Sequence, residues 1–359
     1  MSGLFLYCRP GFEPECAAEI QEKSSQAGLV GYIKAKADSG YVVFVTTTPE
    51  EAAQLHQLLS FSELIFARQW FVILAMRNDL PVDDRISGLL DAMQALPEPA
   101  GLLYLETPDT NAGKELSVLC RRLEQPLRKA LVDSGRLTEP ADAGLCIHIC
   151  FLSTHAAYIG YASSQNSAVW PMGIPRLKFP GQAPSRSTLK LEEALLYFLS
   201  DRQREKMLQS GMTAVDLGAS PGGWTWQLVR RNIRVIAVDN GAMAESVMAT
   251  GLVEHRRVDG FKFRPEHKVD WLVCDVVEQP IRIAELMASW LVSDWCNHAI
   301  FNLKLPMKKR YPEVKRCLAL IEQKLSEAGI DYILRARQLY HDREEVTVFI
   351  TRQVYQRNR

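Results

Sequence analysis

The sequence predicts an α/β protein in two parts, an α+β region over residues 1–165 and an open sheet covered on both faces over residues 188–359. In the second part, apolar runs that suit strands buried on both faces alternate with amphipathic helical stretches, which is typical of a largely parallel sheet. In the first part, short strands and helices also alternate, and turn residues separate them. Residues 166–187 carry four prolines and no apolar periodicity, so they are the predicted linker.

The elements of residues 1–165 are predicted from the spacing of apolar residues, which is about two in strands and about 3.6 in helices. Pro126 lies inside the longest predicted helix and is expected to kink it. Strands are expected at residues 4–8, 30–37, 41–46, 64–74, 102–107, 145–152 and 156–162, and helices at 14–25, 49–60, 82–96 and 115–135.

The same criteria apply to residues 188–359. Strands are expected at residues 213–217, 234–239, 253–259, 269–275, 299–305, 332–340 and 345–351, and helices at 188–200, 224–231 and 312–329, with further helices between several of the strands. The last two strands are joined by the four residues HDRE, which predicts a hairpin and therefore an antiparallel edge on the sheet.

Composition indicates an ordinary globular protein. The chain has 359 residues, 47% of them apolar, which is enough for two buried cores. No stretch approaches the roughly 18 consecutive apolar residues of a membrane span, and the first residues lack the pattern of a targeting signal, so the expected location is the cytoplasm. The eight cysteines show no Cys-x-x-Cys pair, so neither a disulfide framework nor a zinc knot is expected.

Cys146, His148 and Cys150 alternate along one predicted strand and share one of its faces. A packed strand face is the preferred interpretation, because no fourth ligand for a metal ion is present in the pattern. We therefore expect no metal site.

The two halves of the chain differ in charge although the whole chain is neutral. Residues 1–170 hold 13 Lys and Arg against 20 Asp and Glu, a net charge of −7, so residues 171–359 hold 29 against 22, a net charge of +7. This asymmetry favours contact between the C-terminal half and a polyanion. Any nucleic-acid contact of the acidic half must use a local basic patch.

Residues 213–224, TAVDLGASPGGW, carry the strongest functional signal. A buried strand ends here in a glycine turn, and Gly218, Gly222 and Gly223 allow the backbone to turn and to approach a ligand closely. Ser220 and Pro221 complete the turn, and Trp224 opens the next helix. Trp224 is counted with these turn residues among the candidate cofactor-binding residues. The segment is typical of a nucleotide-cofactor loop, and a plain α/β turn with incidental glycines is the alternative.

The glycine spacing narrows the choice of cofactor. It does not match the G-x-G-x-x-G pattern of dinucleotide sites, and no Gly-Lys-Ser/Thr follows for a triphosphate. The next strand ends at Asp239, 21 residues beyond Gly218, where a carboxylate can accept both ribose hydroxyls of an adenosine. This combination suits S-adenosyl-L-methionine, which has a ribose but no phosphate.

Charged residues stand at the carboxyl ends of the predicted strands, where ligands of open α/β sheets bind. Asp216 and Asp239 end the first two strands, Asp275 ends the fourth, and Lys304 ends the fifth. A lysine that closes a buried strand is either paired in a salt bridge, here with Asp275, or is a general base. Lys190 is the candidate for a second cation beside Lys304. If Ser187 caps the next helix, Lys190 lies in its first turn, where the helix dipole disfavours a positive charge and a partner must compensate.

Five segments together resemble, in order, the ribose 2′-O-methyltransferases with a Lys-Asp-Lys-Glu tetrad. They are SRSTLKLEE (185–193), DLGASPGGW (216–224), VCD (273–275), NLKLP (302–306) and REEVTV (343–348). The resemblance implies a Rossmann-like S-adenosylmethionine-dependent methyltransferase domain. It assigns the tetrad to Lys190, Asp275, Lys304 and Glu345, with Glu344 as the alternative to Glu345, which is favoured because it directly precedes a strand.

The longer strings FNLKLPMKKRY (301–311) and ARQLYHDREEVTV (336–348) are similar to members of this family that carry an N-terminal ferredoxin-like plus THUMP-type RNA-binding region, here residues 1–165. The resemblance implies that the substrate is a cytidine in 23S ribosomal RNA, as naked RNA or in an early assembly intermediate. It also implies that the cofactor is lined by Ser187, the turn 220–223, Asp239, Asp259 and Asp275. Asp259, at the end of its own strand, can accept from an adenine amino group.

The mechanism expected from these residues needs no metal ion. Lys304 removes the proton of the ribose 2′-hydroxyl, Lys190 stabilises the developing charge on the oxygen, and Asp275 positions the two lysines. Glu345 tethers Lys190 or the ribose.

The RNA contacts expected in the C-terminal half are Lys308, Lys309 and Arg310, with four linker residues that mix charge and stacking surface, Trp170, Arg176, Lys178 and Phe179. In the N-terminal half the candidate patch is Arg121, Arg122, Arg128 and Lys129 on the long helix. Solvated charge is the alternative interpretation at each of these places.

Two other functions stay open. An RNA base methyltransferase can use a cysteine nucleophile, and Cys274 stands next to Asp275, although the usual Pro-Cys context and the Asn/Asp-Pro-Pro-aromatic motif of amino-methyltransferases are both missing. A non-catalytic RNA-binding assembly factor would keep the domain without needing Lys304 or Glu345.

Overall fold

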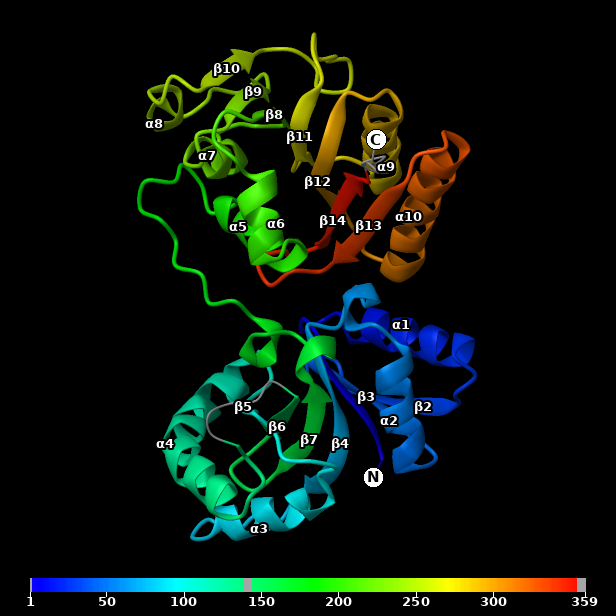
Figure 1. Cartoon of the computed structure of the whole chain (residues 1–359), viewed down its shortest axis with the longest axis vertical. Helices are drawn as coiled ribbons and strands as arrows, with labels where there is room; N and C mark the ends of the chain where they lie inside the picture. The colour runs from blue at the N-terminus through cyan, green and yellow to red at the C-terminus, as the bar shows by residue number, and fades with distance from the viewer. Residues whose placement is uncertain (1, 139–143, 354–359) are drawn as a thin grey trace, which may run out of the picture. The chain divides into compact units, whose positions relative to one another are not determined.

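A computed structural model describes residues 2–138 and 144–353. The chain divides into two compact units, Met1–Pro175 and Arg176–Arg359, and each contains its own seven-stranded sheet (Figure 1). The boundary falls inside the predicted linker. In the described part of the chain, no helix is both long and apolar enough to cross a membrane.

In the residues that the structure describes, the N-terminal unit contains seven strands, four α-helices and four short 3₁₀-helices. In chain order they are β1 (Gly3–Tyr7), α1 (Glu13–Gln26), β2 (Gly31–Ala35), β3 (Tyr41–Thr46), α2 (Pro49–Leu58), η1 (Phe61–Glu63), β4 (Gln69–Arg77), α3 (Arg85–Ala92), η2 (Met93–Ala95), β5 (Leu102–Glu106), α4 (Asn111–Asp133), β6 (Leu145–Phe151), β7 (Ala157–Ser163), η3 (Ser164–Asn166) and η4 (Pro171–Gly173). Pro126 lies within α4, which runs on as one helix.

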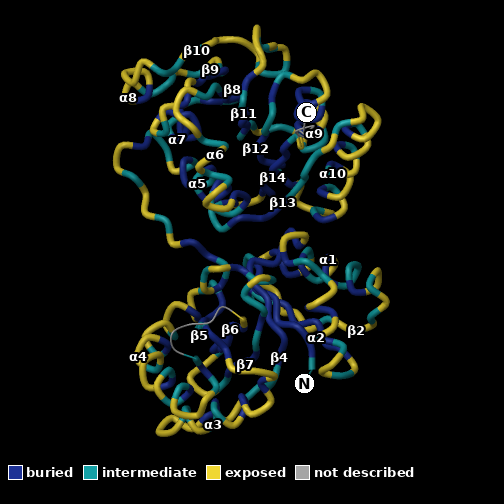
Figure 2. Tube along the Cα trace, viewed as in Figure 1, coloured by how far each residue is buried: buried dark blue, intermediate teal, exposed yellow. Residues whose placement is uncertain are grey.

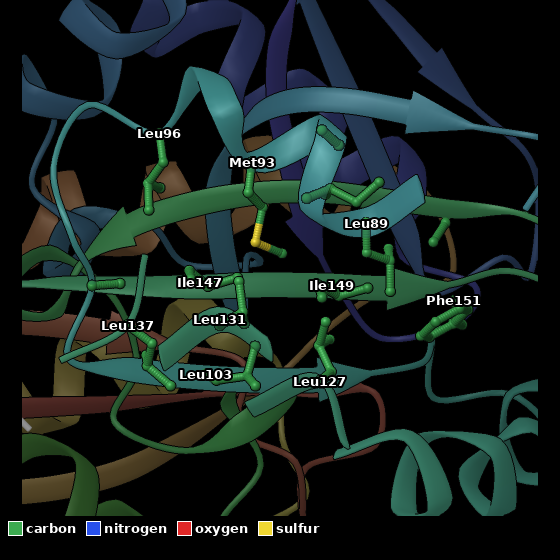
Figure 3. Packing of buried hydrophobic residues seen from close by; sticks show 14 of the residues in the cluster. Leu89, Met93, Leu96, Leu103, Leu127, Leu131, Leu137, Ile147, Ile149 and Phe151 are labelled. Carbon is green, nitrogen blue, oxygen red and sulfur yellow. The ribbon is translucent and has the colours of Figure 1, made fainter. Parts of the chain in front are cut away.

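The strand order of the N-terminal sheet is β2-β3-β1-β4-β7-β6-β5, and only β5 and β6 pair in parallel. One core packs α3 and α4 against β5, β6 and β7 (Figure 3). Leu127 and Leu131 of α4 and Ile147 and Ile149 of β6 are fully buried there. This burial explains the alternating apolar residues of β6, and it places His148 on the opposite face.

The structure starts β4 at Gln69, five residues later than predicted. The preceding backbone is satisfied by a side chain instead of a neighbouring strand, because Glu19 of α1 accepts hydrogen bonds from the N–H groups of Ile65 and Phe66 at 2.6 and 2.9 Å. An apolar run alone does not reveal such a long-range partner.

The first half of the predicted linker 166–187 packs into the N-terminal unit. Asn166 Oδ1 accepts from the N–H of Phe61, and its backbone oxygen accepts from Trp70 Nε1. Met172 N donates to the buried carboxylate of Glu106. These contacts end the unit at Pro175, so the connecting segment begins at residue 176.

The C-terminal unit contains seven strands and six α-helices in its described residues. In chain order they are α5 (Thr188–Phe198), α6 (Asp201–Met207), β8 (Thr213–Leu217), α7 (Gly223–Val229), β9 (Arg234–Val238), α8 (Glu245–Met248), β10 (Val253–Arg256), β11 (Val269–Cys274), α9 (Pro280–Val292), β12 (Cys296–Lys304), α10 (Arg310–Glu327), β13 (Tyr332–Arg337) and β14 (Glu345–Arg352).

The strand order of the C-terminal sheet is β10-β9-β8-β11-β12-β14-β13. The first five strands are parallel, and β14 runs antiparallel to both of its neighbours, as the predicted hairpin requires. The central strands are buried (Figure 2). α5 and α7 pack on one face of the sheet, whereas α9 packs on β12 and contacts α10 (Figure 1).

Two differences from the predicted elements have local causes. β12 begins at Cys296, three residues early, because Cys296 to His298 continue the parallel pairing with β11. The unpredicted helix α6 begins at a capping box, in which the Ser200 side chain accepts from Gln203 N and the Gln203 side chain accepts from Ser200 N.

Candidate active site

Parallel pairing brings the carboxyl ends of β9, β8, β11 and β12 to one edge of the C-terminal sheet. Asp239 directly follows β9, Asp275 directly follows β11, and Lys304 is the last residue of β12. The sequence predicted this alignment, and the structure brings Asp275 and Lys304 into direct contact.

Asp275 lies at the centre of a cluster of polar side chains. Its Oδ1 atom contacts Lys304 Nζ and accepts a hydrogen bond from Asn302 Nδ2 at 2.9 Å. Its Oδ2 atom accepts from Lys190 Nζ at 3.4 Å. The side chains of Lys190, Asp275 and Lys304 are 15%, 16% and 19% exposed, so the cluster is largely shielded but reachable from solvent.

Glu345 is the fourth member of the cluster. It is the first residue of β14 and stands opposite Lys304 in the antiparallel register. Its Oε1 atom contacts Lys190 Nζ and lies 3.9 Å from Lys304 Nζ. Glu344 is directed elsewhere, because its carboxylate pairs with Arg310 at 2.6 Å and is 60% exposed. The geometry therefore favours Glu345 over Glu344.

Lys190 is held in its charged form by this arrangement. Burial alone would lower the pKa of Lys190, but the charges of Asp275 and Glu345 and the hydrogen bond to Glu345 outweigh it and raise the pKa above its usual value. Lys190 is the third residue of α5, as expected, and the two acids provide the compensation that a cation in a first helical turn requires.

Ser187 precedes α5, but its side chain makes no capping hydrogen bond, contrary to the prediction. Its backbone is already helical, with φ −60° and ψ −19°, and its hydroxyl pairs with that of Ser185 at 2.6 Å. Gly223 packs against this pair, since a Cβ atom at Gly223 would lie 2.2 Å from Ser187 Oγ. The glycine is required here for the contact between α7 and the segment before α5.

Asp216 lies within β8, one residue before its end, and is 1% exposed. Its carboxylate accepts from Thr225 Oγ1 at 2.6 Å. Burial raises the pKa of Asp216 to about 7 despite this hydrogen bond. Asp216 therefore links β8 to α7 through a buried hydrogen bond.

A cavity of about 320 Å³ opens beside the glycine turn at the carboxyl ends of β8, β9 and β11. It is lined by Leu217, Gly218, Val238, Asp239, Asn240, Val258, Asp259, Gly260, Phe261, Val276 and Leu286. Three predicted cofactor residues, Gly218, Asp239 and Asp259, are among them. Gly218 has φ +75°, and a Cβ atom there would lie 2.4 Å from Val276 Cγ2, so the wall at this point requires glycine.

Two carboxylates shape the rim of the cavity. Asp239 accepts from Ser220 N at 3.1 Å and from Gly241 N at 2.7 Å, which fixes the glycine turn to the end of β9. Asp259 accepts from Phe261 N at 2.9 Å. A carboxylate offers about four lone-pair sites, so both groups keep the capacity to accept hydrogen bonds from a ribose or an amino group.

These features fit an adenosine-containing cofactor such as S-adenosyl-L-methionine. The cavity has a glycine wall that admits close approach, two acids with free acceptor capacity, and apolar surface from Val258, Phe261 and Val276. The sequence analysis did not single out Val258, Phe261, Val276 or Asn240. These residues follow the ends of β9, β10 and β11, so their position after a predicted strand was the signal that could have identified them.

Other predicted cofactor residues lie outside this cavity lining. Ser220 and Pro221 form the turn, where the Ser220 hydroxyl donates to Ala242 O at 2.8 Å and Pro221 O accepts from Ala244 N at 2.9 Å. Gly222 has φ +114° and precedes α7. Trp224 is 3% exposed and belongs to the hydrophobic core, so its side chain does not face the cavity, contrary to the prediction.

No group of side chains in the described ranges is arranged to hold a metal ion. His148 is fully buried, and its Nδ1 atom lies 2.9 Å from the Glu106 carboxylate, which also accepts from the Tyr7 hydroxyl at 3.0 Å. Cys146 and Cys150 are buried on the same strand. The alternating face of β6 is thus a packed strand face.

Family models match most of the chain. The RlmM ferredoxin-like domain matches residues 1–71, the N-terminal model of ribosomal RNA large subunit methyltransferase M matches residues 84–163, and the FtsJ-like methyltransferase model matches residues 183–323. The fold predicted from the sequence, a ferredoxin-like region followed by a Rossmann-like methyltransferase domain, is confirmed.

Full-length relatives carry the same name. Ribosomal RNA large subunit methyltransferase M of Pasteurella multocida is 52% identical over an alignment of length 359, and the alignment covers 98% of each chain. The protein of that name from Methylococcus capsulatus is 54% identical over 349 residues, 97% of this chain and 98% of the relative. The protein is an S-adenosyl-L-methionine-dependent methyltransferase. The chain belongs to the ribosomal RNA large subunit methyltransferase M family.

Proposed function

We propose that the protein methylates the 2′-hydroxyl of a ribose in RNA, at a cytidine of 23S ribosomal RNA, with Lys304 as the general base. The observation that carries the proposal is the contact of Lys304 with Asp275 at the strand edge that also bears the glycine turn and the cavity. The names of the relatives support a ribosomal RNA substrate of the large subunit. Under this proposal the substrate is naked RNA or an early assembly intermediate, and we expect the enzyme to act in the cytoplasm.

Each member of the tetrad has a separate task. S-Adenosyl-L-methionine, when bound, supplies a methyl group on a positively charged sulfur, which leaves as a neutral thioether. Lys304 Nζ accepts the proton of the attacking hydroxyl, while Lys190 stays charged between Asp275 and Glu345 and stabilises the negative charge that develops on the oxygen. Asp275 orients both amines by contacting each of them.

Base methylation through a cysteine is disfavoured by the position of Cys274. The thiol is fully buried within β11, and burial raises its pKa to about 12. A thiolate is needed for nucleophilic attack, so Cys274 is unsuited to this chemistry at neutral pH.

We also propose that one face of α4 contacts the RNA backbone. Lys114, Arg121, Arg122 and Lys129 are exposed, and their spacing places them on one side of the helix, whose acids Glu115, Glu124 and Asp133 flank this side. This basic stripe stands out in the acidic half of the chain and suits RNA phosphates. Arg128, at the margin of the stripe, is half-buried.

Near the tetrad, Lys308 and Lys309 are exposed and remain candidates for phosphate contact. Arg310 forms a salt bridge with Glu344, so it is not proposed as a phosphate contact, unlike the expectation from the sequence.

The test is to incubate the protein and S-adenosyl-L-methionine with 23S ribosomal RNA, digest the RNA to nucleosides and identify the methylated product. The proposal predicts 2′-O-methylcytidine. A base-methylated nucleoside would contradict it, and RNA binding without any methylated product would favour the assembly-factor alternative.

A further inference from the structure

We infer that Asn302 is a positioning residue for methyl transfer, which holds the Asp275 carboxylate through a buried hydrogen-bond chain that continues to Thr347 and Asp342. The inference rests on the proposed function, because it concerns the orientation of the acid that contacts both lysines. Asn302, Thr347 and Asp342 are each 0% exposed, so they reach neither solvent nor a bound ligand directly.

Asn302 approaches Asp275 from β12. It lies two residues before Lys304, on the same face of that strand, and its Nδ2 atom donates to Asp275 Oδ1 at 2.9 Å. Lys304 contacts the same oxygen. Because an ionised carboxylate only accepts hydrogen bonds, the amide nitrogen of Asn302 must face Asp275, and the amide oxygen must face the other way.

Thr347 stands opposite Asn302 in the pairing of β12 with β14. Its Oγ1 atom lies 2.7 Å from Asn302 Oδ1, and 3.1 and 2.9 Å from the two carboxyl oxygens of Asp342. A hydroxyl carries one hydrogen, and Asn302 Oδ1 requires it. The contact between Thr347 and Asp342 then needs a hydrogen that Asp342 supplies.

Asp342 is suited to supply that hydrogen. Its Oδ2 atom accepts from Leu339 N at 2.9 Å, so a proton on the carboxyl group is expected on Oδ1. Burial raises the pKa of Asp342 well above its usual value, and the negative charge of Glu345 raises it further. With Asp342 neutral, donors point in one direction along the chain, from Asp342 to Thr347, from Thr347 to Asn302 and from Asn302 to Asp275.

The chain gives Asp275 a support that is independent of the lysines. Without Asn302, the carboxylate would be held at this point by Lys190 and Lys304 alone, which are the groups that it has to orient. A fixed acid sets the place of Lys304 Nζ relative to the reacting hydroxyl, and small displacements at this step are costly for the rate.

The main test compares Thr347→Val with Thr347→Ser in the full-length protein. Valine has nearly the same shape but no hydroxyl, so it leaves Asn302 Oδ1 without its donor, whereas serine keeps the hydroxyl. We expect Thr347→Val to lower kcat by about 10- to 100-fold with little change in the KM for S-adenosyl-L-methionine, and Thr347→Ser to restore most of kcat.

A second pair tests the protonation of the chain. Asparagine at position 342 can donate to Thr347 and accept from Leu339 as a neutral acid does, so Asp342→Asn should restore the kcat that Asp342→Leu loses. Failure of Asp342→Asn to exceed Asp342→Leu would contradict a neutral Asp342.

Asn302→Asp adds a readout that a purely structural role would not move. An ionised aspartate at this position adds a negative charge beside Lys304 and favours its ammonium form, so the pH of half-maximal kcat should rise by about one unit. The titratable groups that face this position are Lys190 on α5, Asp275 after β11, Lys304 on β12, the neutral Asp342 before β14 and Glu345 on β14. If near-ultraviolet circular dichroism shows that Thr347→Val does not fold, the pH profile of Asn302→Asp tests the positioning role instead.

The outcomes separate this inference from the proposed function. Equal kcat for Thr347→Val and Thr347→Ser, or an unshifted pH profile for Asn302→Asp, would overturn the positioning role while Lys304→Ala remains inactive. Full activity of Lys304→Ala would instead remove the proposed function itself.

Discussion

Asp275 connects the two lysines of the site, yet its own position depends on a residue outside the tetrad. Lys190 and Lys304 reach its two oxygens from α5 and β12, and Asn302 adds a neutral donor. The tetrad was proposed from the resemblance of five segments to a known family, and the structure brings its four members into one cluster. Asn302 could not be singled out, because its importance arises from pairing between β12 and β14, which is a tertiary property.

A substitution of Cys274 distinguishes ribose methylation from base methylation through a cysteine nucleophile. Because its thiol is buried and its pKa is raised to about 12, Cys274→Ala should keep methylation within about twofold of the unmodified protein. The measurement is the rate of 2′-O-methylcytidine formation. A loss as large as that expected for Lys304→Ala would point to a catalytic thiol.

Asp216 predicts a pH dependence of stability. Its folded pKa of about 7 lies above the usual value of 3.8, so the folded state binds more protons than the unfolded state between these values, and the free energy of unfolding falls as pH rises from about 4 to 7. Asp216→Asn removes this titration while its amide oxygen still accepts from Thr225. The variant should therefore gain stability relative to the original protein between pH 5 and pH 8, by an amount on the order of a few kcal/mol.

Urea unfolding at the two pH values measures this difference. A constant difference between Asp216→Asn and the original protein would show that Asp216 titrates normally.

At the scale of elements, most strands were predicted within about a residue, and the largest error falls where a long-range contact decides. β3 and β8 match their predicted bounds. β4 starts late because Glu19 caps the backbone before it, and β10 ends early at Arg256, so Asp259 lies in the following loop. Trp224 was counted among the candidate cofactor residues, but its side chain packs into the hydrophobic core.

The backbone conformation of the glycine turn predicts that a larger residue at Gly218 weakens the binding of S-adenosyl-L-methionine. Gly218→Ala would force a Cβ atom to within 2.4 Å of Val276 in a left-handed conformation, and would so deform the wall of the cavity. We expect the Kd for S-adenosyl-L-methionine to rise by about tenfold or more, which corresponds to about 1.4 kcal/mol. Isothermal titration calorimetry measures this change.

Gly181→Ala is the matched control, because a Cβ atom at Gly181 meets nothing within 4 Å and its φ is not left-handed. The interpretation of the cavity as the cofactor site would be wrong if the two variants bound S-adenosyl-L-methionine equally well.

On the scale of the whole molecule, the chain combines an acidic N-terminal half with a basic C-terminal half, and each unit folds around its own sheet. Composition predicted two cores and the charge asymmetry. The end of the N-terminal unit was not predictable from the proline pattern, because the hydrogen bonds of Asn166 and Met172 tie the first half of that segment to the sheet.

The basic stripe on α4 predicts how the N-terminal unit takes part in RNA binding. Arg121→Glu combined with Arg122→Glu should raise the KM for 23S ribosomal RNA and reduce the salt dependence of binding, because fewer phosphates are neutralised. The kcat and the affinity for S-adenosyl-L-methionine should stay unchanged. The same charge change at Lys34 and Lys36 provides the control, since both residues are exposed around β2 on the same unit. If the two double variants had equal effects, the loss of RNA binding would reflect net charge alone, and the proposed contact of α4 with RNA would be wrong.

The most direct test of the account is the rate of 2′-O-methylcytidine formation by Lys304→Ala and Lys304→Arg, together with their affinity for S-adenosyl-L-methionine. Arginine keeps the positive charge beside Asp275 but does not act as a base, because it remains protonated. If Lys304 is the general base, both variants lose activity by a factor on the order of 100 to 10,000 and still bind S-adenosyl-L-methionine. Substantial methylation by Lys304→Arg would contradict the account, because a fixed charge would then be sufficient.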